Sequence, residues 1–160
     1  MADKFGGCEV IEMAIEIEKN GRDFYAALAQ KSSDVIVADL FNFLSKEEEK
    51  HIGVFVTLRD AVASCSLNEH TSDEYFAYLN AIAGEHVFMR AGKGAEAAYR
   101  VSGDQEALSL ALAFEMDSIV FFEGLRDLVP QSESSLIDVL IAQERKHVVQ
   151  LNEMKKKGAA

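Results

Sequence analysis

The sequence has few of the residues that interrupt helices or build cysteine-based metal sites. It contains one proline, Pro130, no tryptophan, and two cysteines, Cys8 and Cys65, which form no C-x-x-C pair. A four-cysteine zinc or iron site is therefore excluded. Two free thiols fit a reducing compartment better than a disulfide scaffold, and the N-terminus lacks the basic segment and apolar run of a secretory signal. We therefore expect a cytoplasmic protein.

Long apolar runs and excess positive charge are also absent. No stretch approaches the ~18 consecutive apolar residues that a membrane-spanning helix needs, so no membrane segment is expected. Lys and Arg together number 16 against 27 Asp and Glu, which gives a formal net charge of −11. A chain this acidic is not expected to have nucleic acid or an anionic membrane surface as its main partner.

Helical periodicity dominates what the sequence does contain. The chain has 160 residues, of which 49% are hydrophobic, enough for residues 1–160 to form one domain with a substantial core. Apolar residues recur at helical spacing in four long segments, so an all-α protein is expected. The predicted helices cover about residues 8–30, 34–63, 103–129, and 132 to the fading stretch "MKKKGAA".

The segment between the second and third predicted helices, about residues 64–102, has a different character. We interpret it as a long crossover with one or two short helices, the first capped near Ser72. The other two connections are short, with turn and capping residues at Ser32 to Asp34 and a helix stop at Pro130. Short, long, short is the connectivity of an antiparallel four-helix bundle made of two hairpins.

The two predicted hairpins are related by an internal repeat. Residues Ala14 to Leu28 align without gaps on Ala111 to Leu125, and the second helix aligns similarly on the fourth. The alignment pairs six polar residues: Glu18 with Glu115, Glu48 with Glu144, and His51 with His147. The two halves should therefore be related by a pseudo-twofold axis.

The four repeated glutamates each lie in the middle of an apolar helical stripe. Burying one ionised carboxylate without a partner costs several kcal/mol, so four in one core require cations. Two divalent ions balance four carboxylates, and the Glu-x-x-His spacing places both side chains on one helical turn. Mixed oxygen and nitrogen ligands suit iron or manganese, with zinc possible. The predicted ligands are Glu18, Glu48, His51, Glu115, Glu144 and His147.

At these residues the sequence resembles the ferritin-like diiron-carboxylate superfamily, and within it the rubrerythrin-type domain. The family pattern of Glu, Glu-x-x-His, Glu and Glu-x-x-His on successive helices is complete here. The resemblance implies that Glu48 and Glu144 bridge two irons, while Glu18 and Glu115 are terminal ligands, each sharing an iron with one histidine. An aromatic residue follows the first ligand by seven positions, as in the family. It is Tyr25, a candidate to hydrogen-bond a ligand carboxylate.

The sequence also departs from the rubrerythrin pattern. Ser118 stands where rubrerythrins carry a second glutamate on the third helix, and the two C-x-x-C pairs of a rubredoxin-like domain are absent. Electrons would therefore come from a separate protein. Glu85 is a weak match for a further crossover carboxylate of some relatives, and His70 and His86 are expected to be surface or packing residues. The sequence does not settle whether Glu85 or His86 reaches the site.

The resemblance implies a two-iron oxidoreductase that reduces H₂O₂ or O₂, in the manner of a rubrerythrin-like peroxidase, and that forms a homodimer. Phe55, Phe114, Phe121 and Phe122 are candidates to line its cavity, although ordinary core packing explains each of them equally well. Three alternatives remain open at this point. They are a ferroxidase that handles iron in a cage-like assembly, a dimanganese catalase-like enzyme, and a non-catalytic metal-binding module.

Overall fold

The structure is a computed structural model that describes residues 7–62, 72–86 and 92–159. These residues form helices and no strand, which confirms the all-α prediction. The elements are α1 (Gly7–Lys31), α2 (Val35–Ala61), α3 (Asp73–Glu85), α4 (Lys93–Arg100), α5 (Asp104–Leu128) and α6 (Gln131–Ala159).

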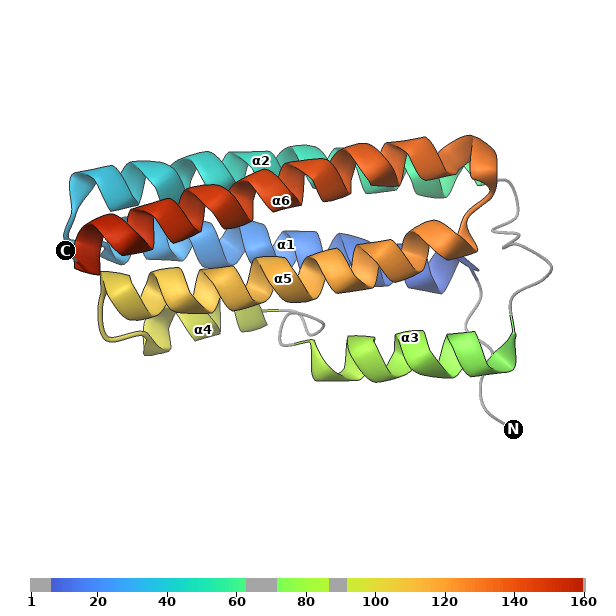
Figure 1. Cartoon of the computed structure of the whole chain (residues 1–160), viewed down its shortest axis with the longest axis horizontal. Coiled ribbons are helices and arrows are strands. Elements are labelled where there is room, and N and C mark those ends of the chain that lie inside the picture. Colours follow the sequence, from blue (N-terminus) through green and yellow to red (C-terminus); the bar gives the residue numbers. More distant parts are fainter. Residues whose placement is uncertain (1–6, 63–71, 87–91, 160) are drawn as a thin grey trace.

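Four of these helices run side by side along the length of the molecule (Figure 1). Helices α1 and α2 pack together as one hairpin, and α5 and α6 pack as the other. Short loops connect the helices within each hairpin, whereas the connection from α2 to α5 carries α3 and α4. The ferritin-like four-helix bundle with one long crossover is therefore confirmed, and the predicted short helices of the crossover are α3 and α4.

Local sequence signals explain where the long helices begin and end. The Asp34 carboxylate caps α2 by accepting hydrogen bonds from the backbone N–H groups of Ile36 (2.8 Å) and Val37 (3.3 Å). Helix α5 ends at Leu128, and the next residue, Val129, is extended because Pro130 disfavours helical backbone angles in the residue before it. The predicted stop at Pro130 is thus confirmed, and the chain turns at once into α6.

The crossover helix α4 is fixed against α1 by an unusually close contact. A Cβ atom on Gly94 would lie 1.9 Å from the backbone oxygen of Asn20, so only glycine fits there. The Gly94 N–H donates to Asn20 Oδ1 at 3.1 Å. At the other end of α4, Lys31 Nζ donates to the carbonyl oxygens of Tyr99, at 3.0 Å, and Val101. The second half of the crossover is therefore anchored to the first helix.

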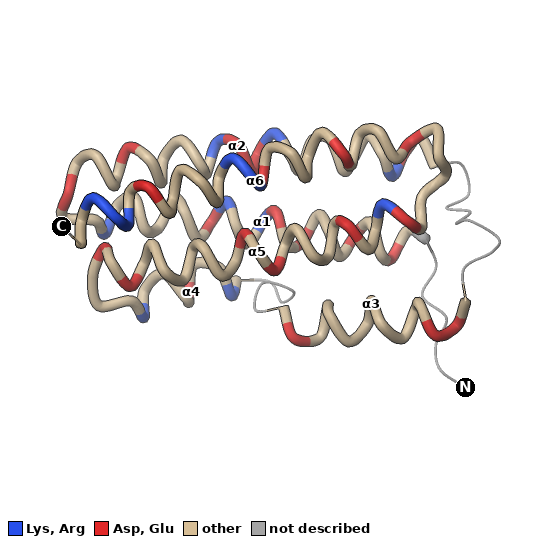
Figure 2. Tube along the Cα trace, viewed as in Figure 1, with Lys and Arg blue, Asp and Glu red and all other residues tan. Residues whose placement is uncertain are grey.

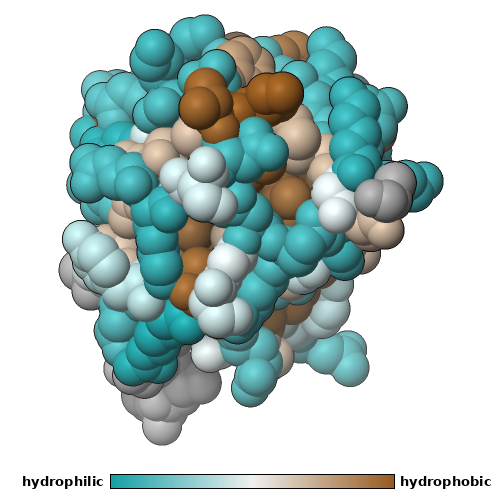
Figure 3. All heavy atoms as spheres, turned by 90° about the vertical axis from the view of Figure 1, so that its left-hand side faces the viewer, coloured by the Kyte–Doolittle hydropathy of each residue, from teal (hydrophilic) through white to brown (hydrophobic). Residues whose placement is uncertain are grey.

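The buried apolar residues form one core that runs through the bundle. Charged residues occur along all four long helices (Figure 2). One end of the molecule presents a mostly hydrophilic surface with some hydrophobic side chains between the polar ones (Figure 3). Among the exposed hydrophobic residues are Val35 and Ile36, at the first turn of α2.

The state of the cysteines differs from the prediction. Cys8 is disulfide-bonded, so the prediction of two free thiols is wrong; Cys65 lies outside the described residues. Sequence spacing did not reveal the Cys8 disulfide, because such a bond depends on tertiary proximity. The cysteine content therefore gives no support for a reducing compartment. Within residues 7–62, 72–86 and 92–159, no helix is long and apolar enough to cross a membrane.

Candidate metal centre

The bundle brings all six predicted ligands together in its interior. Helix α1 contributes Glu18, and α5 contributes Glu115; the Glu-x-x-His pairs come from α2 and α6. The exposed fraction of each of the six residues is 2% or less. Each sits among apolar neighbours on its own helix, so burying the hydrophobic stripes carries these polar groups inward.

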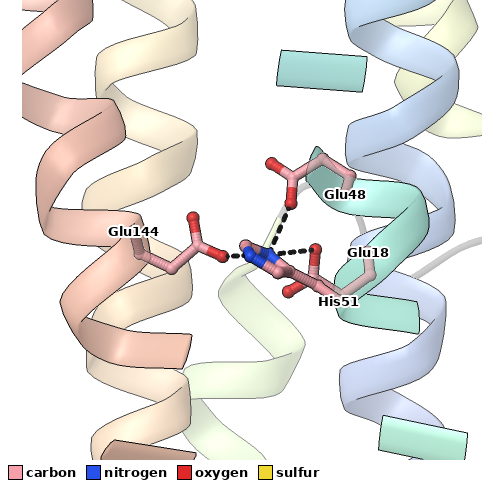
Figure 4. A group of neighbouring side chains, drawn as sticks. All are labelled: Glu18, Glu48, His51 and Glu144. Carbon is pink, nitrogen blue, oxygen red and sulfur yellow. Dashed lines mark hydrogen bonds and ion pairs between the residues drawn. The ribbon is translucent and has the colours of Figure 1, made fainter. Parts of the chain in front are cut away.

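One group of side chains surrounds His51 (Figure 4). Its Nδ1 atom lies 2.6 Å from Glu144 Oε1, 3.0 Å from Glu48 Oε2 and 3.7 Å from Glu18 Oε2. One ligand atom from each of these four residues lies within 4.8 Å of the others. Three helices, α1, α2 and α6, therefore place donor atoms around a single point.

A second group surrounds His147. Its Nδ1 atom lies 3.1 Å from Glu144 Oε2 and 3.7 Å from Glu115 Oε1, and Glu48 completes the group. Glu48 and Glu144 belong to both groups, so these two carboxylates stand between the two positions. The imidazole rings of His51 and His147 are stacked with centroids 5.6 Å apart.

Two further residues support the ligands from outside. The Tyr25 hydroxyl donates to Glu115 Oε1 at 2.5 Å, so the structure places the predicted tyrosine directly on a candidate ligand. Gln143 was not among the predicted site residues, and its Oε1 lies 2.9 Å from His51 Nε2. The internal repeat contains a usable signal, because Gln143 and its counterpart Glu47 each directly precede a repeated glutamate.

The electrostatics of the metal-free cluster show that these groups compete for protons. Burial, reinforced by the nearby Glu144 charge, raises the pKa of Glu115 to about 8. Burial also raises the pKa of Glu48 well above its ordinary value, with repulsion from Glu18 and Glu115 adding to it. In Glu144 burial opposes ionisation, but the hydrogen bond with His147 and the close contact with His51 outweigh it and lower the pKa. Without a cation, protons must neutralise the crowded carboxylates.

The histidines respond in the opposite direction to burial. Burial alone would lower the pKa of His147, yet its close contacts with Glu115 and Glu144 raise it to about 10. The pKa of His51 is likewise raised, because its contacts with Glu144, Glu18 and Glu48 outweigh desolvation. Without metal, the positive charges of the two protonated histidines therefore partly neutralise the carboxylates, as bound metal cations would.

The donor set fits two divalent cations. Four fully buried carboxylate oxygens, one from each glutamate, accept no hydrogen bond; they are Glu18 Oε1, Glu48 Oε1, Glu115 Oε2 and Glu144 Oε1. Glu144 Oε1 is close to His51 Nδ1, at 2.6 Å, but the direction of that contact is poor for a hydrogen bond. Buried polar atoms without partners are rare in folded proteins and indicate a missing ion or water.

The other candidates from the sequence lie around this cluster. Glu85 is exposed at the end of α3 and does not belong to either Glu/His group in the described part of the chain. His86 is buried, but it too lies outside both groups, with its Nε2 atom 3.3 Å from Ser118 Oγ. Phe114 lies near the cluster, because a Cβ atom on Gly21 would touch both Phe114 Cζ and Glu48 Cγ. His70 lies outside the described residues.

Comparison with known proteins assigns the family. A family model for rubrerythrin matches residues 9–102, which include the first-half ligands Glu18, Glu48 and His51. The chain belongs to the rubrerythrin family. This confirms the resemblance drawn from the ligand pattern, although the rubrerythrin match does not extend over the second-half ligands on α5 and α6.

A solved structure of similar fold covers nearly the whole chain. It is a candidate ferritin-like diiron-carboxylate protein from Thermotoga maritima, with a TM-score of 0.70 and 22% sequence identity. The similarity covers 96% of this chain and 97% of the other. At this level of identity the likeness supports the ferritin-like fold of this rubrerythrin-family protein. No curated protein sequence matches the chain significantly.

Proposed function

We propose that this rubrerythrin-family protein binds two iron ions and reduces H₂O₂ or O₂ with electrons from a separate donor protein. The observation that carries the proposal is the pair of buried Glu/His groups that share Glu48 and Glu144. Glu18 and His51 would hold one ion, and Glu115 and His147 the other. Manganese and zinc accept the same donors, and the diiron description of the Thermotoga maritima protein supports iron.

A bound iron pair would supply two electrons to the O–O bond, so that H₂O₂, two electrons and two protons yield two water molecules. The protein's own residues prepare the site for this chemistry. Burial keeps bulk water out, the four carboxylates match the charge of two divalent ions, and Tyr25 orients Glu115 through its hydroxyl. Gln143 orients His51 by accepting its Nε2–H, which leaves Nδ1 facing the carboxylates.

Metal analysis and peroxide turnover test the proposal together. We expect about two iron ions per chain and consumption of H₂O₂ when an artificial electron donor is supplied. Glu144→Ala should lose most of the metal and the activity. Glu153→Ala, at an exposed glutamate on the same helix, is the matched control and should retain both. Full metal content and activity in Glu144→Ala would overturn the site assignment.

The same assay separates the alternative functions. Iron oxidation by O₂ without peroxide turnover, in a cage-sized assembly, would identify a ferroxidase. Evolution of O₂ from H₂O₂ without a reductant would identify a catalase-like activity. Metal binding without turnover would identify a non-catalytic module. We also infer a homodimer from the family resemblance, which sedimentation analysis of the purified protein tests directly.

A further inference from the structure

A second buried polar pair lies beside the metal ligands without belonging to them. His86, at the end of α3, is 6% exposed, and Ser118 on α5 is 1% exposed. Their side chains meet with His86 Nε2 3.3 Å from Ser118 Oγ. Burial lowers the pKa of His86 to about 4, so at neutral pH the ring is neutral and has one nitrogen that donates and one that accepts.

Two relations, one through Ser118 and one through His86, place this pair near the Glu/His cluster. Ser118 follows Glu115 by three residues, so the two side chains are on the same face of α5, one turn apart. The ring of His86 meets the Phe114 ring edge-on, with centroids 5.8 Å apart. Phe114 in turn fills the space left by Gly21, where a Cβ atom would be 3.5 Å from Glu48 Cγ. His86 is therefore separated from the cluster by one layer of side chains.

His86 also borders the outside of the molecule. A hollow of about 380 Å³ opens between α3 and α5, and His86 forms part of its wall. The remaining wall residues are Tyr78, Ala81, Ile82, Glu85, Asp117 and Val120. This volume is large enough for several water molecules. His86 is thus in contact with both the hollow and the buried Ser118 hydroxyl.

The reaction under "Proposed function" consumes two protons for every H₂O₂ reduced, at ligands that are nearly inaccessible to water. We propose that His86 and Ser118 carry these protons from the hollow to the Glu/His cluster. This inference rests on the proposed peroxide or O₂ reduction.

The transfer is balanced at each atom. Each hydroxide formed when the O–O bond is cleaved takes a proton from Ser118 Oγ and leaves as water, and Ser118 Oγ receives the Nε2 proton of His86. A hydronium ion from the solvent in the hollow gives a proton to Nδ1 of the ring and becomes water. Exchange with water in the hollow then restores the starting tautomer. The electrons come separately, from the donor protein.

Three variants of the iron-loaded protein test the relay. His86→Phe keeps an aromatic ring against Phe114 but cannot carry a proton, and Ser118→Ala removes the hydroxyl. We expect each to slow oxidation of the reduced centre by H₂O₂ about 100-fold in a single turnover, with unchanged iron content. His86→Ala should regain much of its rate when imidazole is added, because the hollow admits the small ring. Ser45→Ala, which removes a serine hydroxyl on α2 that bonds only to the Arg22 carbonyl among its described contacts, should react normally.

Imidazole binding to the metal-free variants shows whether the cavity left by His86 is filled, independently of the reaction rate. Imidazole should bind in the cavity of metal-free His86→Ala, as detected by NMR, and should not bind to His86→Phe. A wild-type rate in iron-loaded His86→Phe would overturn the relay, as would imidazole binding without recovery of the rate. Failure of the wild-type protein to bind iron or consume peroxide would instead overturn the proposed function on which the relay rests.

Discussion

The two hairpins carry the same six ligands, yet the residues next to those ligands differ. The repeat aligns Tyr25 on α1 with Phe122 on α5. Tyr25 donates its hydroxyl to Glu115, whereas Phe122 has no hydroxyl to offer Glu18. Gly21 and Ser118 are also aligned; the first leaves space for Phe114, and the second contacts His86.

The two hairpins also differ in the residues that lie beside the two histidines. Gln143, a neutral amide, faces Nε2 of His51. Its aligned counterpart on α2 is Glu47, a carboxylate that pairs with Lys50 at 2.6 Å and whose charge interacts with His147 and, to a smaller extent, with His51. The comparison teaches that the repeated helices supply a symmetric set of donors, while their neighbours make the two metal positions chemically unequal.

The largest expected effect is the loss of bound metal when a ligand shared by both groups is removed, compared with a ligand that belongs to one group. Glu48→Ala removes a carboxylate that belongs to both groups, so we expect nearly all metal to be lost. Glu18→Ala removes a ligand of one group only and should leave about one metal ion per chain. Metal analysis after gel filtration measures both. Equal losses in the two variants would show that the halves do not act as separate positions.

The pH dependence of stability should reverse when metal binds. The folded-state pKa of Glu115, about 8, exceeds the ordinary value of 4.5, so its contribution to stability is complete below pH 4.5 and is lost as pH rises through about 8. His147, raised from 6.5 to about 10, loses its contribution between those values. Metal requires deprotonated ligands and binds more tightly as pH rises.

Thermal unfolding at about pH 6 and about pH 9 measures this reversal. The metal-free protein should unfold at a lower temperature at the higher pH. The increase in unfolding temperature that metal produces should be larger at the higher pH than at the lower one. A metal-free protein that is equally stable at both pH values would contradict the assigned proton distribution.

Gln143→Leu should weaken one metal position and spare the other. The substitution removes the acceptor for His51 Nε2–H while keeping a side chain of similar size. Loss of such a partner typically reduces metal affinity about 10- to 100-fold. Calorimetric titration with Zn²⁺ should therefore show a weakened first or second phase alone. Weakening of both phases to the same extent would indicate general damage to the bundle instead of a specific role.

The smallest effect is expected for Tyr25→Phe, which makes α1 resemble α5 at this position. Removing the hydroxyl that holds Glu115 should lower metal affinity about 10-fold at the position of His147. The matched control is Tyr99→Phe, because Tyr99 is 74% exposed. Titration curves of Tyr25→Phe that coincide with those of Tyr99→Phe would exclude a role for the hydroxyl in holding the ligand.

The sequence was sufficient to predict the bundle and the positions of its inward-facing polar groups. Helical spacing fixes which residues share a face, so Glu18 and Glu115 could be assigned to apolar stripes without coordinates. Contacts between helices are less accessible to this reasoning. Gln143 reaches His51 across 92 positions of the chain, and His86 reaches Ser118 from a crossover that has no repeat to guide an alignment. These contacts depend on how the helices pack against one another, which periodicity alone does not specify.

The contact between Gly94 and Asn20 has a consequence for the ligand two residues earlier on α1. With a Cβ-to-oxygen separation of 1.9 Å at a substituted Gly94, no side chain can be inserted between the helices. Rotating or sliding α1 far enough to swing Glu18 out of the bundle would drive its backbone into α4. Helix α4, which contributes no ligand to the candidate metal centre, therefore restricts the movement of α1 and of its ligand Glu18. Insertions or deletions in the crossover that move α4 would therefore displace Glu18, although they make no direct contact with it.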